Sequence, residues 1–192
     1  MPSTSKEPPC GLDAFGDGPQ PFGVLAHVGA SLRAVRFSAM AAAVRKLEPH
    51  DAAACDAIVA GLPEWFGNQQ GIRDCAIAVR SHAGLVATDE IGVTGFLTWT
   101  QDRERGVAEI TWMAVRADLR RHGIGRSLLG ALIERLQEER VHRLDVKTLS
   151  ERAAYAPYAE TRDFYVANGF EPIAELDIWD EENPAVLMRR SL

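Results

Sequence analysis

The sequence is poor in cysteine, and its three cysteines lie far apart, at Cys10, Cys55 and Cys75. Zinc sites use cysteines in short paired spacings and disulfide frameworks use an even number, so neither is predicted here. Long apolar runs are also missing, since none approaches the roughly 20 residues of a membrane-spanning helix. The apolar run at 24–32 is followed, not preceded, by arginines and has no small-residue cleavage site after it, which argues against a signal peptide. These absences favour a protein of the reducing cytoplasm that does not bind a membrane.

Basic side chains are outnumbered in this chain. It has 21 Lys and Arg against 27 Asp and Glu, which gives a net charge of −6. Such a balance opposes nonspecific binding to phosphate backbones and anionic lipids, so we expect no nucleic-acid partner. The remaining composition, 46% hydrophobic and 25% charged among 192 residues, is typical of a globular protein with one domain. We expect no metal site.

The N-terminal part differs in composition from the rest. Residues 1–23 hold five of the ten prolines and four glycines, with almost no periodic apolar pattern. The pattern of residues 24–39 does not decide between order and disorder. Met40 opens the first segment with a clear apolar pattern, and translation of the natural protein could begin there. We therefore predict a disordered or poorly ordered leader at 1–39 and a single domain at 40–192.

Hydrophobic periodicity predicts the order β-α-α-β-β-β-α-β-α-β-β, which is a mixed α/β sheet. The expected strands are 43–47, 84–89, 92–100, 107–115, 142–149, 170–176 and 185–190, and the expected helices are 51–62, 69–82, 123–140 and 160–168. Within the strand at 107–115, alternation predicts that one face carries Glu109, Thr111 and Met113 and the other carries Ile110, Trp112 and Ala114.

An arginine- and glycine-rich segment joins this strand to the helix at 123–140, and it reads Arg120-Arg121-His122-Gly123-Ile124-Gly125-Arg126. The first four N–H groups of a helix have no partner within it, and no Ser, Thr, Asp or Asn directly precedes Gly123 to cap them. The two glycines leave room for a bulky anion, and the positive helix end beside the arginines suits a diphosphate. The alternative is an ordinary glycine turn with solvated arginines.

Two other nucleotide-binding loops do not fit this segment. The P-loop needs Gly-Lys-Ser/Thr, whereas Gly125 is followed by Arg126-Ser127 and the required upstream glycine is missing. The dinucleotide fingerprint needs a third glycine three positions after Gly125, where this chain has Leu128. Both classes are therefore excluded by spacing.

The segment resembles the signature of the GNAT (GCN5-related) N-acetyltransferases, Arg/Gln-x-x-Gly-x-Gly/Ala, which here runs from Arg120 to Gly125. The strand at 108–115 is similar to the fourth strand of that family, and residues 164–170, with a tyrosine before a Gly-Phe pair, are similar to its helix-to-strand passage. The resemblance covers about 43–190. It implies the GNAT fold, a mixed and mostly antiparallel sheet of about six to seven strands flanked by about four helices.

The resemblance also implies that acetyl-CoA, or a related acyl-CoA, is the co-substrate. Its pyrophosphate would lie on the backbone amides of the glycine segment, and its pantetheine arm on an exposed strand edge that a bulge splays from the next strand. The positions that match the family's cofactor-binding residues are Met113, Ala114, Val115, Arg120, Arg121, His122, Gly123, Ile124, Gly125 and Arg126.

Two side chains are candidates for the chemistry. Glu109 lies where related enzymes often place a general base, acting directly or through water, to take a proton from the amine. Tyr165 falls where a phenol commonly acts as a general acid toward the CoA sulfur. The alternatives are a solvent-facing glutamate and a tyrosine that only packs its helix against the sheet. Backbone N–H groups of the bulged strand are the expected oxyanion donors.

The acceptor is a small-molecule amine or a peptide amine by this interpretation. Trp65, Phe66 and Trp179 either wall the acceptor pocket or are simple core. A run of carboxylates comprises Glu175, Asp177, Asp180, Glu181 and Glu182. It either attracts a cationic amine acceptor or is only a solvated loop. An alternative function is a non-catalytic acyl-CoA sensor or interaction module on the same fold. The protein could also form a homodimer.

Overall fold

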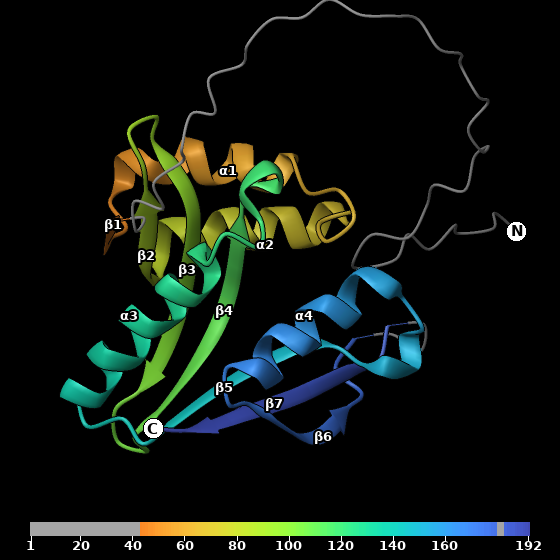
Figure 1. Ribbon diagram of the computed structural model, residues 1–192. Coiled ribbons are helices and arrows are strands. Elements are labelled where there is room, and N and C mark those ends of the chain that lie inside the picture. The colour runs from red at the N-terminus through yellow and green to blue at the C-terminus, as the bar shows by residue number, and fades with distance from the viewer. Residues whose placement is uncertain (1–42, 180–182) are drawn as a thin grey trace, which may run out of the picture.

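The computed structural model describes residues 43–179 and 183–192 (Figure 1). The described residues form one sheet in the order β1-β2-β3-β4-β5-β7-β6. Its strands are β1 (Ala43–Lys46), β2 (Ala83–Thr88), β3 (Val93–Asp102), β4 (Val107–Val115), β5 (Arg143–Leu149), β6 (Glu171–Leu176) and β7 (Ala185–Ser191). The helices are α1 (Ala52–Ala60), α2 (Gln69–Ser81), α3 (Ile124–Glu138) and α4 (Ala156–Ala167). The predicted leader at 1–39 and the acidic residues 180–182 lie outside the described residues.

The predicted element order and the mostly antiparallel sheet are confirmed. Among the described strands, β4 and β5 are the parallel pair, because α3 crosses between them, and the other neighbours are antiparallel. The last predicted helix was too short, since α4 begins at Ala156 rather than at residue 160. Pro157 stands in its first turn, where a missing N–H costs no helical hydrogen bond, so a proline there starts a helix instead of breaking it.

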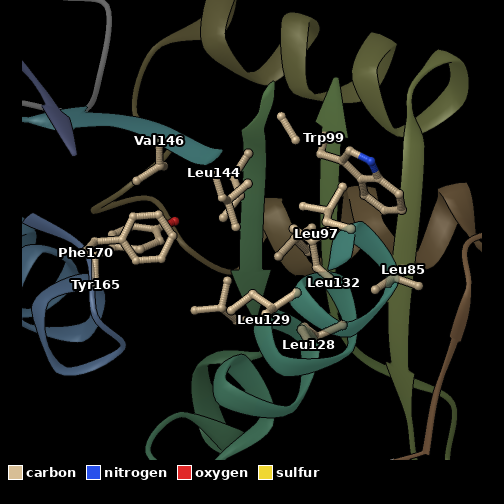
Figure 2. Close-up of a cluster of buried hydrophobic side chains, with 14 of the residues drawn as sticks. Leu85, Leu97, Trp99, Leu128, Leu129, Leu132, Leu144, Val146, Tyr165 and Phe170 are labelled. Atoms are coloured by element: carbon tan, nitrogen blue, oxygen red, sulfur yellow. The ribbon is translucent and has the colours of Figure 1, made fainter. Parts of the chain in front are cut away.

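The helices cover both faces of the sheet (Figure 1). The apolar side chains of α3 pack on one face, in a buried cluster that also includes Leu97 of β3, Leu144 of β5 and Tyr165 of α4 (Figure 2). The other face is covered by α1 and α2, whose buried cluster includes Cys55, Cys75 and Phe96. We refer to these as the α3-side core and the α1-side core.

A bulge in β4 overturns the predicted alternation of its side chains. Trp112 pairs with Thr98 of β3 and Ile110 pairs with Trp99, so Thr111 has no partner across the strand. Ile110 and Met113 consequently both pack on the α3-side core, whereas Trp112 and Ala114 pack on the α1-side core. An extra residue shifts the side-chain period by one, which strict alternation cannot anticipate.

The strands β4 and β5 diverge beyond this bulge (Figure 1). Their pairing runs only from Val107 opposite Arg143 to Ile110 opposite Val146, although β4 continues to Val115 and β5 to Leu149. The segment after Ile110 is thus paired with β3 but not with β5, which leaves backbone groups on that edge without a strand partner.

Candidate active site

The divergence of β4 and β5 opens a cavity of about 730 Å³. Its walls come from β4, from the first turn of α3, from β5 and α4, and from the connection between α1 and α2. All predicted site residues except Glu109 and His122 line it. The three aromatic candidates for the acceptor side also line it, and they are Trp65, Phe66 and Trp179.

The N-terminus of α3 faces this cavity without a side-chain cap. Gly123 is the N-cap residue and has a left-handed backbone with φ 86°, and Arg121 just before it has φ 64°. Glycine adopts such angles at little cost, whereas an arginine there is uncommon. The turn aims the first amides of α3 outward, and their positive end is suited to bind an anion.

The two glycines of the motif meet different surroundings. A Cβ atom on Gly123 would have no heavy atom within 4 Å. On Gly125 it would lie 3.3 Å from Cε2 and 3.4 Å from Cζ of Phe164. Gly125 is therefore needed for the close approach of α3 and α4, while the space at Gly123 is open to a ligand.

Two of the motif's arginines contact α4. Arg120 and Arg121 each donate to the Glu160 carboxylate, at 3.2 and 2.7 Å, and the guanidinium of Arg120 lies 4.0 Å from the ring centroid of Trp65. Ion pairs this exposed contribute little to stability, so a phosphate group can compete for these arginines. His122 is exposed, with Nδ1 2.8 Å from the Arg120 carbonyl oxygen, and the structure does not bring it into the cavity wall.

Glu109 is engaged by a lysine of the neighbouring strand. The Lys147 ammonium donates to both Glu109 carboxylate oxygens, at 2.8 and 2.9 Å. Lys147 lines the cavity, whereas Glu109 does not and lies on the part of β4 that pairs with β5. Both Glu109 oxygens therefore already accept a hydrogen bond.

Tyr165 is buried at the junction of α4 with the sheet and is 4% exposed. Its ring packs edge-on against Phe164 and Phe170, with centroids 5.3 and 5.2 Å away. Figure 2 shows its hydroxyl on the edge of the ring that faces β4. Burial raises the pKa of the Tyr165 phenol above its usual value, so the hydroxyl keeps its proton near neutral pH. It is thus both part of the core and a donor at the cavity wall.

The cavity wall also contains polar contacts that the sequence did not indicate. The Tyr158 hydroxyl donates to the Trp65 carbonyl oxygen at 3.1 Å, which ties α4 to the loop before α2. At the bulge, Thr111 lines the cavity and its Oγ1 lies 2.8 Å from Oγ1 of Thr98 and 3.1 Å from Nδ1 of His82. The His82 contact spans 29 positions, and no local pattern reveals it.

The sequence profile of the acetyltransferase (GNAT) domain matches residues 80–172, which hold the bulged strand, the glycine segment and most of α4. The chain therefore contains the GNAT acetyltransferase domain over these residues. A comparison with curated protein sequences finds no significant match. Among the residues that the structure describes, no helix is long and apolar enough to cross a membrane.

Solved structures show the same fold as this GNAT protein. A protein assigned to the GNAT acetyltransferases from Desulfovibrio desulfuricans has a TM-score of 0.69 at 21% identity, over 79% of this chain and 99% of that one. The ribosomal-protein-S18-alanine N-acetyltransferase of Escherichia coli has a TM-score of 0.62 at 19% identity, over 78% and 92%. The ribosomal-protein-alanine N-acetyltransferase of Brucella melitensis has a TM-score of 0.61 at 23% identity, over 78% and 99%.

Proposed function

We propose that this GNAT protein transfers an acetyl group from acetyl-CoA to a primary amine, which attacks the thioester directly in a ternary complex. The observation that carries the proposal is the cavity at the divergence of β4 and β5. It joins an uncapped helix N-terminus, an unpaired strand edge, the Tyr165 hydroxyl and an aromatic wall in one continuous space. Each of these features fits one part of the two substrates.

The donor would be held by backbone groups more than by side chains. The amides from Gly123 to Arg126 and the exposed Arg121 suit the pyrophosphate, and the open space at Gly123 has room for it. The edge of β4 from Met113 to Val115 suits the amide-bearing pantetheine arm, because such an arm can pair with a strand edge as another strand would. This fit supports acetyl-CoA as the donor.

At the reacting centre, the thioester supplies the acetyl group and a good leaving group. Tyr165 would donate a hydrogen bond to the sulfur as negative charge develops on it, and N–H groups at the β4 bulge would donate to the carbonyl oxygen. Glu109 stays a proposed proton acceptor for the amine. Each Glu109 oxygen accepts one hydrogen bond from Lys147 and keeps a further acceptor position, and Glu109→Gln tests whether Glu109 takes the proton.

For the acceptor we favour a small cationic amine or the N-terminal or lysine amine of a peptide. Two carboxylates, Glu175 and Asp177, lie at the end of β6 and close in sequence to Trp179 of the cavity wall. Negative charge attracts an ammonium-bearing acceptor. Two structural neighbours are named for acetylating the alanine of a ribosomal protein, which makes an N-terminal alanine peptide a suitable first probe.

The test is turnover with acetyl-CoA and a panel of amines, followed by the release of free thiol at low and high salt. We expect acetylation of cationic amines that weakens as salt rises. Thermal stabilisation by CoA with no turnover across the panel would favour the non-catalytic sensor instead. Preference for anionic acceptors would contradict the proposed acceptor class.

A matched pair of arginines tests the donor site separately. Arg121 in the glycine segment and Arg105 in the turn before β4 are both about 80% exposed, at 79% and 81%, and both have a carboxylate partner. We expect Arg121→Ala to weaken acetyl-CoA binding several-fold and Arg105→Ala to leave it unchanged. Equal effects of the two would show that only overall charge matters.

A further inference from the structure

A chain of three polar side chains leads from the cavity to a histidine on the α1-side of the sheet. Thr111, the bulge residue of β4, lines the cavity, and its Oγ1 lies 3.1 Å from Nδ1 of His82 and 2.8 Å from Oγ1 of Thr98. We propose that the acceptor amine loses its proton along this chain, through the Thr111 hydroxyl to His82. This inference rests on the proposed amine acetylation.

Hydrogen-bond counting fixes the direction of the chain. A hydroxyl has one donor and two acceptor positions. When His82 is neutral and its Nδ1 is unprotonated, the Thr111 hydroxyl donates to it, so the buried Thr98 hydroxyl must donate to Thr111. One lone pair of Thr111 Oγ1 is left over, and it is available to a donor that enters the cavity. An ammonium group is such a donor.

The proton transfer balances without a further reactant. An N–H bond of the ammonium breaks and its proton binds Thr111 Oγ1, while the Thr111 hydroxyl proton passes to Nδ1 of His82, which becomes an imidazolium. The freed lone pair forms the C–N bond with the acetyl carbon. When the C–S bond breaks, the electron pair leaves with sulfur and the second nitrogen proton completes the thiol. The half-buried His82 then returns its proton to solvent.

The position of His82 suits the charge that it would carry. It is the C-cap residue of α2, and its backbone N–H donates to the Ala78 carbonyl oxygen at 2.8 Å. The C-terminal end of a helix stabilises a cation. Imidazole ordinarily changes its charge between about pH 5 and 8, which matches the work of a proton acceptor near neutral pH.

Two ion pairs lie on the elements near His82. Arg80, in the last turn of α2, pairs with Asp56 of α1, and Glu109 of β4 pairs with Lys147 of β5. Within the described residues, the His82 ring contacts the Thr111 hydroxyl through Nδ1. His82 and Glu109 are thus alternative acceptors for the same proton, and they differ in that a lysine holds both oxygens of Glu109.

Two acceptor amines of different basicity show whether His82 and Thr111 remove a proton or act on the reaction in another way. An alkylamine is an ammonium ion at neutral pH and must lose a proton, whereas methoxyamine is already uncharged. We expect His82→Gln and Thr111→Val to lower kcat/KM for the alkylamine by about 100-fold or more. For methoxyamine we expect a change of no more than about threefold, because no base is needed there.

Further readouts and controls make the outcome unambiguous. In the wild-type protein kcat/KM for the alkylamine should fall at acidic pH, where an imidazole is already protonated, and His82→Gln should remove this fall. Thr111→Ser keeps the hydroxyl and should restore activity even if Thr111→Val disturbs the bulge. Ser81→Ala, at the same helix end, alters only an exposed hydroxyl that donates to the Ile77 carbonyl oxygen, and it should leave the kinetics unchanged.

Three results would overturn the proposal. Equal losses on both acceptors would show that His82 and Thr111 only shape the site. A loss confined to the alkylamine in Glu109→Gln, and absent in His82→Gln, would assign the proton to Glu109. If the wild-type protein binds acetyl-CoA but acetylates neither amine, the proposed function itself fails, and this inference fails with it.

Discussion

Replacing Tyr165 by phenylalanine removes one hydroxyl from the cavity wall and keeps the ring that packs on Phe164 and Phe170. The pKa of a phenol is ordinarily about 10 and that of a thiol about 8.5, so full proton transfer to the thiolate is uphill by about 2 kcal/mol. Burial raises the pKa of Tyr165 and increases this difference. We therefore expect Tyr165 to act as a hydrogen-bond donor. A hydrogen bond to a charged group contributes about 1.5–3 kcal/mol, so kcat should fall by about 10- to 150-fold.

The assay is thiol release under saturating amine, with acetyl-CoA affinity measured by calorimetry. We expect an unchanged Kd and a loss of unfolding free energy of no more than about 1 kcal/mol, since the ring contacts remain. Because the raised pKa keeps Tyr165 protonated, the ratio of wild-type to variant kcat should stay constant between about pH 6 and 9. Tyr155→Phe, outside the cavity wall, is the matched control. An equal kcat in Tyr165→Phe would leave Tyr165 only its packing role.

Three further predictions follow from the same structure. Gly123→Ala should weaken acetyl-CoA binding and lower the free energy of unfolding by about 1–2 kcal/mol, because alanine is strained in the left-handed backbone of this residue. Gly125→Ala should also strain the contact of α3 with α4. Unchanged acetyl-CoA affinity in folded Gly123→Ala would refute the anion site. Burial raises the pKa of the Cys55 and Cys75 thiols in the folded protein to about 12. As the pH rises, these thiols therefore lose their protons in the unfolded chain before they do so in the folded protein, and the free energy of unfolding measured in urea should fall above about pH 9. A free energy of unfolding that does not change with pH would contradict this. Deleting residues 1–39 should leave the acetyl-CoA Kd within about twofold, and a loss of folding would place the domain boundary earlier.

The glycine segment shows how much a local pattern can establish. Its arginines, its two glycines and the absence of a capping residue are all contiguous in the sequence, and they predicted an uncapped helix N-terminus that the structure contains. The sequence nevertheless did not reveal the full reason for glycine at position 125. Gly125 is required by Phe164, which lies 39 positions further along the chain, and no spacing rule connects the two.

The proposed reacting centre was less predictable than the proposed cofactor side. Glu109 was recognised as a carboxylate on the right strand, but its engagement by Lys147 depends on the parallel pairing of β4 with β5 across 38 positions. Thr111 and His82 gave no signal at all, because their contact requires both the bulge and the packing of α2 against that face. Side chains that meet across a sheet share no local sequence pattern.

The sequence by itself determined the order of strands and helices, the resemblance to the GNAT domain and the uncapped glycine turn before α3, because hydrophobic periodicity and capping depend on neighbouring residues. Only the tertiary structure decided which side chains share the cavity. One unpaired residue at Thr111 shifts the period of β4, brings Ile110 and Met113 to the same core, and accompanies the divergence from β5. The pairing register of two strands is set by their packing as a whole, so it is settled only when the sheet is assembled.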